Sequence, residues 1–319
     1  MRAYILALFA ILAASPAFAD WTACLPANAP DHFFAVDKGK DRLFQMRGDG
    51  ITSAVVKAFP SIHGRAEGDK QVQGDLKTPE GVYFITHKIN QKLDFMDYGP
   101  HAFGLNYPNP MDRLRAKTGG GIWLHSKGQP IKGIQTRGCV AIGQEDITAL
   151  VPVLAPGTPV LIAQNLDGEP FIQKEEKQPG AKGQGVEAQQ ADASGTKAAQ
   201  PDARQEEAFL ILSLTKTWIE HMHDGSEAVF ALYDSSRWQK ANRESFFDFM
   251  AKKRVDLAHG AGDMQADSIR LLEGPGYWVA FFPRSFVQGK DSFNGTQILY
   301  WSRGDAGSFR IIGEFRTKG

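Results

Sequence analysis

Short apolar runs separated by Gly, Pro and Asp turn residues fill the first half of the chain. The runs at 33–36, 82–85 and 159–162 are rich in aromatic and β-branched residues, which favour strands. Residues 146–154 have the spacing of one short helix, which a Pro-Gly pair would end. The pattern therefore predicts a mainly β domain over residues 32–164.

The last third of the chain changes its period. Its apolar residues first recur at a spacing that places them on one helical face: Phe209, Leu212, Trp218, Ile219, Val229, Phe230 and Tyr233. Three later runs, at 277–282, 296–301 and 308–315, predict strands joined by turns. Helices followed by strands are typical of an α+β domain, which we expect over residues 205–319.

The segment between these two units, residues 165–204, is dominated by Gln, Lys, Glu, Gly and Ala. Such a composition cannot bury enough apolar surface to offset the entropy of ordering the chain, so it predicts a flexible linker. The chain length also predicts two domains, because about 300 residues exceed what one hydrophobic core usually organises.

The first 19 residues have the order of a secretory signal peptide. Arg2 precedes an apolar run, and small residues follow up to Ala19, after which cleavage is expected. No later stretch approaches the roughly 18 apolar residues that a spanning helix needs. We therefore expect a periplasmic protein without stable membrane insertion after the signal is removed.

Charge and motif content exclude several classes of partner. The 36 basic and 36 acidic side chains cancel, which removes the electrostatic argument for nucleic acid. No phosphate-binding Gly-x-x-x-x-Gly-Lys-Ser/Thr pattern occurs. His221 and His223 lack cysteine or carboxylate partners at ligand spacing. We expect neither a cofactor nor a metal.

The chain has two cysteines, Cys24 and Cys139. A single disulfide is one interpretation in an oxidising compartment, although the sequence gives no reason for the two to be close. A second interpretation is a nucleophile. A strand-like run ends at His125, and a polar loop leads to Cys139 in a glycine-flanked turn. A thiol needs a neighbouring imidazole or positive field to become a nucleophile near pH 7.

The neighbours of Cys139 suit acyl transfer. Arg137 could add positive charge beside the thiol, and Gly138 permits a sharp turn that exposes it. The amides around Gly138 and Cys139 could then face a developing oxyanion. Alone, a histidine and a cysteine at this spacing would equally suit a buried structural thiol.

Four blocks of sequence resemble the L,D-transpeptidase catalytic domain, the YkuD family. They are Gly-Asp-Leu-Lys-Thr-Pro-Glu-Gly-Val-Tyr at 74–83, Phe-Gly-Leu-Asn-Tyr-Pro-Asn-Pro-Met-Asp at 103–112, Gly-Ile-Trp-Leu-His at 121–125 and Arg-Gly-Cys at 137–139. The resemblance covers roughly residues 32–164. It implies a β-rich domain whose cysteine attacks the meso-diaminopimelate carbonyl of a peptidoglycan stem peptide and displaces the terminal D-alanine.

The same resemblance assigns roles to individual residues. The family's nucleophile falls on Cys139 and its base on His125, while Gly138 matches the glycine before the nucleophile. A backbone carbonyl at Ser126 would hold the imidazole tautomer. For substrate binding we consider three further side chains: Arg137 for a carboxylate, or else a surface ion pair, and Tyr107 and Trp123 for the stem-peptide groove, or else the core.

One departure bears on the activity. Where the family commonly has Ser-His-Gly-Cys, this chain has Thr-Arg-Gly-Cys. A subgroup with such a departure, which looks like the L,D-carboxypeptidases that set the shape of helical bacteria, carries an appended nuclear-transport-factor-2-like domain. The second unit here, residues 205–319, is similar to that appended domain in its early helices and later aromatic strands. The resemblance thus favours hydrolysis of the terminal D-alanine. The alternatives are transfer to an amine, which gives 3-3 crosslinks, and a non-catalytic peptidoglycan-binding scaffold. The aromatic run 277–282 would line a pocket, mediate a homodimer or form an ordinary core.

Overall fold

The computed structural model describes residues 32–48, 53–166, 203–258, 262–288 and 291–318. The predicted signal peptide, Cys24 and most of the predicted linker lie outside these residues. No helix in the described ranges is both long and apolar enough to span a membrane.

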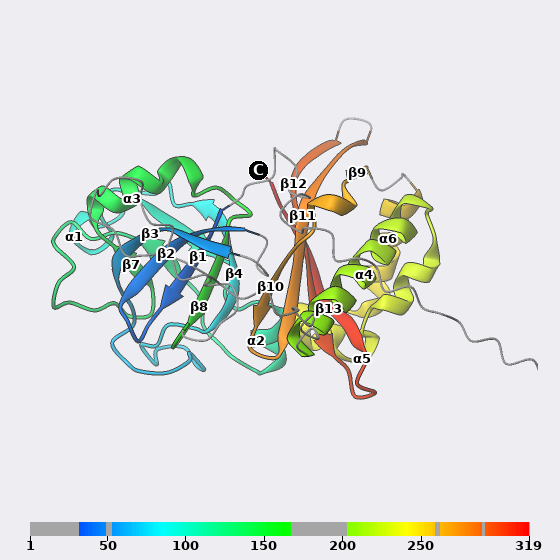
Figure 1. Ribbon diagram of the computed structural model, residues 1–319, viewed down its shortest axis with the longest axis horizontal. Helices are drawn as coiled ribbons and strands as arrows, with labels where there is room; N and C mark the ends of the chain where they lie inside the picture. Colours follow the sequence, from blue (N-terminus) through cyan, green and yellow to red (C-terminus); the bar gives the residue numbers. More distant parts are fainter. Residues whose placement is uncertain (1–31, 49–52, 167–202, 259–261, 289–290, 319) are drawn as a thin grey trace, which may run out of the picture.

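The first unit is a closed barrel of eight strands (Figure 1). Neighbouring strands follow the order β1-β2-β3-β7-β6-β5-β4-β8, and two pairs, β1 with β8 and β6 with β7, are parallel. The strands are β1 (His32–Asp37), β2 (Arg42–Gly48), β3 (Ser53–Ile62), β4 (Gly81–Lys88), β5 (Ala102–Leu105), β6 (Trp123–His125), β7 (Val140–Ile142) and β8 (Pro159–Ala163).

Short helices lie in the barrel's connections. They are α1 (Phe95–Tyr98), α2 (Pro110–Leu114), α3 (Gln144–Leu150) and the 3-10 turn η2 (Val151–Val153). Asn109 caps α2 through a reciprocal capping box with Asp112, and Pro110 occupies the first turn, where no backbone donor is needed. The helix predicted over 146–154 corresponds to α3 and η2. It begins at Gln144 and ends in a 3-10 turn.

The second unit begins with helices and ends with a meander of antiparallel strands. The helices are α4 (Ala203–His223), η3 (Glu227–Leu232), α5 (Ser235–Asn242), α6 (Phe246–Ala258) and η4 (Ala266–Ser268). The strands are β9 (Asp263–Met264), β10 (Arg270–Gly274), β11 (Tyr277–Gln288), β12 (Asp291–Arg303) and β13 (Phe309–Lys318), with β9 paired to β11. The predicted order of helices before strands is confirmed.

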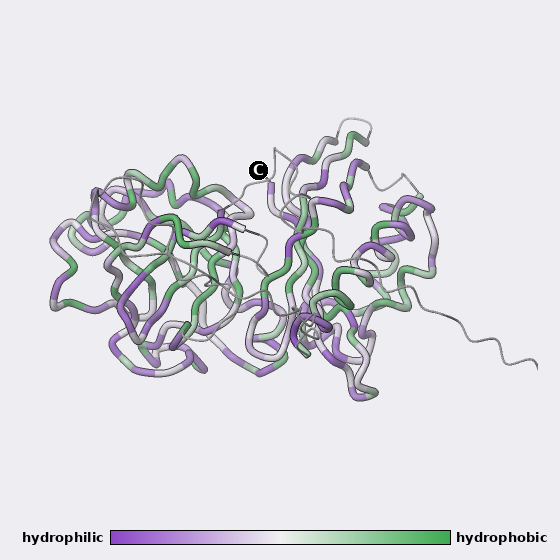
Figure 2. Tube along the Cα trace, in the orientation of Figure 1, coloured by the Kyte–Doolittle hydropathy of each residue, from purple (hydrophilic) through white to green (hydrophobic). Residues whose placement is uncertain are grey.

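The sheet of the second unit stands between the barrel and the helices (Figure 1). Its strand β11 alternates between two cores, as period-two geometry requires. Trp278, Ala280 and Phe282 join the core under the helices, whereas Tyr277, Val279 and Phe281 join a core shared with the barrel. Both faces are buried, so the run 277–282 consists of aromatic and aliphatic residues throughout. Green stretches along the strands between the barrel and the helices show the same burial (Figure 2).

Hydrogen bonds as well as apolar contacts join the two units. The Tyr277 hydroxyl accepts the Val82 N–H at 2.7 Å and a bond from the Asn109 side chain at 3.2 Å. The Tyr300 hydroxyl donates to the Val82 carbonyl at 3.3 Å. Side chains of the second unit's sheet, which we call the accessory sheet, thus satisfy backbone groups of Val82, in the part of β4 that does not pair with β5. We call this shared region, with its apolar residues around Phe84 and Phe281, the interdomain core.

Candidate active site

His125 is the last residue of β6 and is only 2 % exposed. Its Nδ1 donates to the carbonyl of Ser126 at 2.5 Å. That bond fixes the tautomer with hydrogen on Nδ1 and leaves Nε2 to accept a proton. Burial is the main reason that the pKa of His125 falls from 6.5 to about 4; the Ser126 carbonyl opposes the fall. At neutral pH the ring is therefore an uncharged base.

Cys139 carries a free, partly buried thiol directly before β7. Because Val140 pairs with Leu124 in the parallel ladder, Cys139 is level with Trp123 and shares the face of the sheet that carries His125. The thiol donates to the Gly121 carbonyl at 3.6 Å, and the Trp123 backbone amide lowers the pKa of the thiol. No hydrogen bond among the described residues joins the thiol to His125.

Electrostatics at the sulfur favour the thiol form. Burial raises the pKa of Cys139 above its ordinary value near 9, and the Trp123 amide and the charges of Lys127 and Lys70 only partly offset this. With His125 uncharged as well, the pair holds its proton on sulfur at neutral pH. Such a pair suits a mechanism in which the base takes the thiol proton as the nucleophile attacks.

Tyr98, at the end of α1, packs against His125 and Trp123. Its ring centroid lies 5.2 Å from that of His125 and 5.2 Å from that of Trp123. Burial, and then the proximity of Cys139, raise the pKa of the Tyr98 hydroxyl, while Arg137 opposes the rise. The neighbouring Gly99, at φ 60°, approaches Ser126 so closely that a Cβ would lie 2.1 Å from the Ser126 hydroxyl oxygen.

The turn before the nucleophile requires glycine for two reasons. Gly138 has φ 130°, a conformation that side chains rarely adopt. A Cβ at this position would also lie 2.8 Å from the Lys77 carbonyl oxygen. The sequence predicted the backbone freedom but not the close approach of residue 77, which is distant in the chain.

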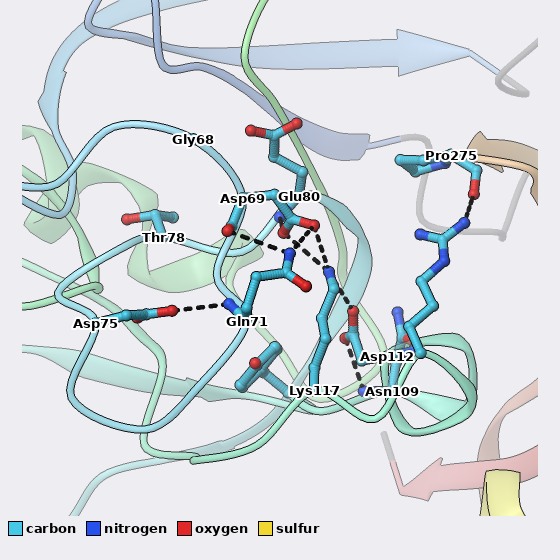
Figure 3. Close-up of polar contacts among 12 residues, drawn as sticks. Gly68, Asp69, Gln71, Asp75, Thr78, Glu80, Asn109, Asp112, Lys117 and Pro275 are labelled. Atoms are coloured by element: carbon cyan, nitrogen blue, oxygen red, sulfur yellow. Dashed lines mark hydrogen bonds and ion pairs between the residues drawn. The ribbon is translucent and has the colours of Figure 1, made fainter.

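A cluster of charged side chains joins Asp69 and Lys117 to Asp112 in α2 (Figure 3). The Lys117 ammonium sits between Asp69 at 2.7 Å and Asp112 at 2.9 Å, and its side chain is 1 % exposed. Asp112 also accepts the Tyr83 hydroxyl at 3.1 Å and the Asn109 N–H at 3.0 Å. Because each oxygen has partners, the carboxylate is held in place in a site that would otherwise disfavour a charge.

The structure brings together most of the residues singled out in the sequence. Ser126 is fully buried and contributes its carbonyl, and Arg137 is exposed beside the turn. Trp123 lies next to the sulfur. Tyr107, in contrast, packs in the barrel core at 6 % exposure, and its hydroxyl donates to the Thr118 carbonyl. This packing agrees with the alternative of a core residue.

Sequence reasoning missed several residues around the site. Tyr98 and Gly99 lie in a polar stretch without a strong pattern, and only the fold places them over His125. Thr78 lies within a block that supported the family resemblance, but nothing in the sequence indicated that its hydroxyl would reach the Gly138 carbonyl, 2.9 Å away. Among the described residues no three metal-ligating side chains gather.

Comparison with known proteins identifies the barrel. Residues 31–162 match the family model of the L,D-transpeptidase catalytic domain, YkuD. The match identifies the barrel as a domain of the L,D-transpeptidase catalytic type. The family acts on peptidoglycan, which implies a location at the cell wall or in the periplasm. A search of curated proteins finds no match to the sequence.

Two solved structures share the arrangement of both units. Bd1075 from Bdellovibrio bacteriovorus is 21 % identical with a TM-score of 0.57, and the match covers 91 % of this chain and 93 % of that one. The helical cell shape determining protein Pgp2 from Campylobacter jejuni is 21 % identical with a TM-score of 0.55, and the match covers 92 % and 97 %. At this identity the similarity establishes a common two-part fold.

Proposed function

We propose that this protein is an exported cysteine enzyme that removes the terminal D-alanine from peptidoglycan tetrapeptide stems, an L,D-carboxypeptidase activity. The observation that supports the proposal is that Cys139 and His125 lie on one face of neighbouring strands, in a domain that matches the L,D-transpeptidase family model. The hydrogen bond from His125 to the Ser126 carbonyl supports it, because that bond leaves Nε2 available as the base.

The proposed reaction proceeds through an acyl-enzyme. His125 Nε2 takes the thiol proton while the sulfur of Cys139 attacks the meso-diaminopimelate carbonyl, whose π electrons move to oxygen. The tetrahedral intermediate then collapses, and the amine of D-alanine leaves with the proton from His125. Water attacks the resulting thioester with His125 again as base, which releases the tripeptide and restores the thiol.

Two features favour hydrolysis over transfer in this proposal. Arg137 occupies the position where the family commonly has a second histidine, and from its exposed place beside the turn it would bind a stem-peptide carboxylate. Trp123 would line the same groove. The second feature is the accessory domain. The L,D-carboxypeptidases that the chain resembles set cell shape, and the two-part fold is shared with a protein described as a determinant of helical cell shape. A role in cell shape is part of the proposal.

The test is to incubate the purified protein with disaccharide tetrapeptide and weigh the products by mass spectrometry. Tripeptide and free D-alanine, without dimers, are expected; crosslinked dimers would instead support transfer to an amine. Cys139→Ala and His125→Gln should each lose activity by at least about 1,000-fold, as removal of a nucleophile or its base does in related chemistry. Normal cell shape in a strain that carries only Cys139→Ala would favour the scaffold alternative.

A further inference from the structure

Two threonine hydroxyls hold the backbone on either side of the candidate nucleophile. Thr136 Oγ1 accepts the Gly138 N–H at 3.1 Å and donates to the Cys139 carbonyl at 2.6 Å. Thr78 Oγ1 donates to the Gly138 carbonyl at 2.9 Å. Gly138 and Cys139 together have four backbone polar groups. The fourth, the Cys139 N–H, has no hydrogen-bond partner in the described part of the chain. The Gly138 amide is thus engaged, although the sequence had suggested both amides as oxyanion donors.

The bond from Thr78 determines where the remaining amide points. The Gly138 carbonyl and the Cys139 N–H belong to one planar trans peptide, in which the two groups point in opposite directions. Thr78 is fully buried and holds the carbonyl on the interior side. The N–H is therefore turned away from the interior. A hydrogen bond to the carbonyl also polarises the peptide and strengthens its N–H as a donor.

Among the described residues, the Thr78 hydroxyl donates its proton to one acceptor, the Gly138 carbonyl. Its oxygen accepts the Gly64 N–H at 2.8 Å, so the single hydroxyl proton is left for the Gly138 carbonyl. The threonine backbone is fixed in turn by Lys38, whose ammonium donates to the Thr78 carbonyl at 3.3 Å and pairs with Glu80 at 2.7 Å. The Lys38 side chain is 1 % exposed, which makes this support part of the barrel interior.

We propose that Thr78 and Thr136 are positioning residues for acyl transfer at Cys139. They hold the peptide between Gly138 and Cys139 so that the Cys139 N–H is the main-chain donor that receives the oxyanion. The inference rests on the proposed function only in taking Cys139 as the nucleophile. As the sulfur–carbon bond forms, the carbonyl electrons move to the oxygen and His125 holds the thiol proton; the fixed amide binds the negative oxygen until the leaving group departs.

Two reactions of the same sulfur separate this role from general structural support. Acylation of Cys139 by p-nitrophenyl acetate passes through an oxyanion and needs no stem-peptide recognition. Alkylation by iodoacetamide consumes the same thiolate by direct displacement and forms no oxyanion. Both rates would be measured in the full-length protein, with the modified cysteine identified by peptide mass mapping. Thermal unfolding followed by circular dichroism would report the folded fraction of each variant.

The expected result is a selective loss. In Thr78→Val, acylation should fall by roughly 10- to 100-fold, somewhat less than when an oxyanion donor is removed outright, while alkylation stays within about 3-fold. Thr78→Ser keeps the hydroxyl and should acylate within about 3-fold of the wild type. Thr136→Val should repeat the selective loss and serves as the second variant if Thr78→Val does not fold.

Three outcomes would overturn the inference: wild-type acylation in both valine variants, an equal loss in the valine and serine variants, or alkylation falling in parallel with acylation. A wild type whose Cys139 is acylated by the ester but which leaves tetrapeptide intact would refute the proposed function alone. If the ester does not acylate Cys139 in the wild type, the positioning role fails as well.

Discussion

His125 shows how the environment of one residue determines its chemistry. The sequence placed a histidine before a cysteine, a pairing often associated with a preformed thiolate. In the folded protein, burial instead keeps the ring uncharged and the sulfur protonated. The two groups are arranged for proton transfer during attack, and this has a measurable consequence in the pH dependence of the reaction.

We expect kcat/KM for tetrapeptide hydrolysis to be insensitive to His125 protonation from pH 7 down to about 5, and to fall as the pH drops through about 4. The reason is that the base works only when unprotonated, and its pKa is lowered. A pH–rate profile would measure this. An acid limb near the ordinary value of 6.5 would contradict it.

The lowered pKa of His125 also makes the folded protein less stable in acid. The pH–rate profile therefore needs a control for unfolding. Between pH 6.5 and about 4 the unfolded chain binds the His125 proton and the folded chain does not, which makes stability decrease as the pH falls through this window. Circular dichroism at each pH would show that lost activity is not lost structure. The rates should be taken only where the protein remains folded.

Gly99 provides a second prediction at the residue scale. Gly99→Ala would place a methyl group against the Ser126 side chain at φ 60° and ψ −159°, a conformation essentially restricted to glycine and costing other residues roughly 1–3 kcal/mol. We expect lower stability, and at least about a 10-fold loss of activity, because a shift of the Ser126 carbonyl misorients His125. Urea unfolding and steady-state kinetics would measure the two effects.

The chain offers a matched control for that substitution. Gly120 lies in the glycine run before β6, and a Cβ there would meet no atom within 4 Å. Gly120→Ala should leave stability within about 0.5 kcal/mol, as ordinary surface substitutions do. Equal behaviour of the two variants would show that contact with Ser126 does not determine the effect.

Among the secondary-structure elements, α2 depends on ionic contacts with segments distant in sequence. Lys117 joins Asp112 in α2 to Asp69, which in turn accepts the Glu80 N–H at 2.9 Å beside the strand β4. Lys117 and Asp112 are almost fully removed from water, and the single ammonium offsets the charge of both carboxylates. The cluster thus holds a helix and a loop against the strand on which the barrel and the accessory sheet meet.

We expect Lys117→Met to lower the free energy of unfolding by about 3–5 kcal/mol, since removal of one partner leaves buried carboxylates without compensation. Lys252→Met, which breaks an exposed pair with Glu244, should change the free energy of unfolding far less, because solvent screens that pair. Urea denaturation of both variants would measure the difference. Similar costs would mean that burial does not govern the strength of the Lys117 contacts.

For the molecule as a whole, the interdomain core makes one structure of two units. Because the accessory sheet buries aromatic side chains against the barrel, separation would expose a large apolar face. A fragment of residues 205–319 would expose that face too, and its self-association would not report on the native state. The predicted homodimer is better tested by gel filtration of the full chain.

A cut in the chain should leave the two units together. We expect that an engineered protease site between residues 167 and 202, once cleaved, yields pieces that still elute as one species, because the interdomain core does not depend on chain continuity. Gel filtration after cleavage would measure this, and two separate peaks would contradict it. Tyr277→Phe should weaken the association, since it leaves the Val82 N–H unpaired at a cost of about 1–3 kcal/mol.

Tyr107→Phe is the control for that substitution. It removes a buried hydroxyl of the same kind, whose partner, the Thr118 carbonyl, lies within the barrel. It should lower the stability of the barrel without favouring separation of the cleaved pieces. Equal dissociation of the two cleaved variants would show that the contact from Tyr277 to Val82 has no special role in the interface.

The sequence by itself determined the local features: the strands at 82–85 and 277–282, the order of helices and strands in the second unit, and Cys139 and His125 as the candidate pair. These follow from periodicity and from motifs a few residues long, which short-range physics is enough to specify. Burial of the run 277–282 on both faces could not be deduced, because a continuous apolar stretch fits a core, a pocket or an interface equally well.

Only the tertiary structure decided which distant groups meet. Thr78 reaches the turn before Cys139, and Tyr98 and Gly99 lie against His125 and Ser126. Tyr107 packs in the core, and Tyr277 completes the hydrogen bonds of a strand in the other unit. The pKa values of His125 and Cys139 were likewise beyond the sequence. Both depend on how much water the surrounding chain excludes, and burial of that kind is a property of the packed molecule.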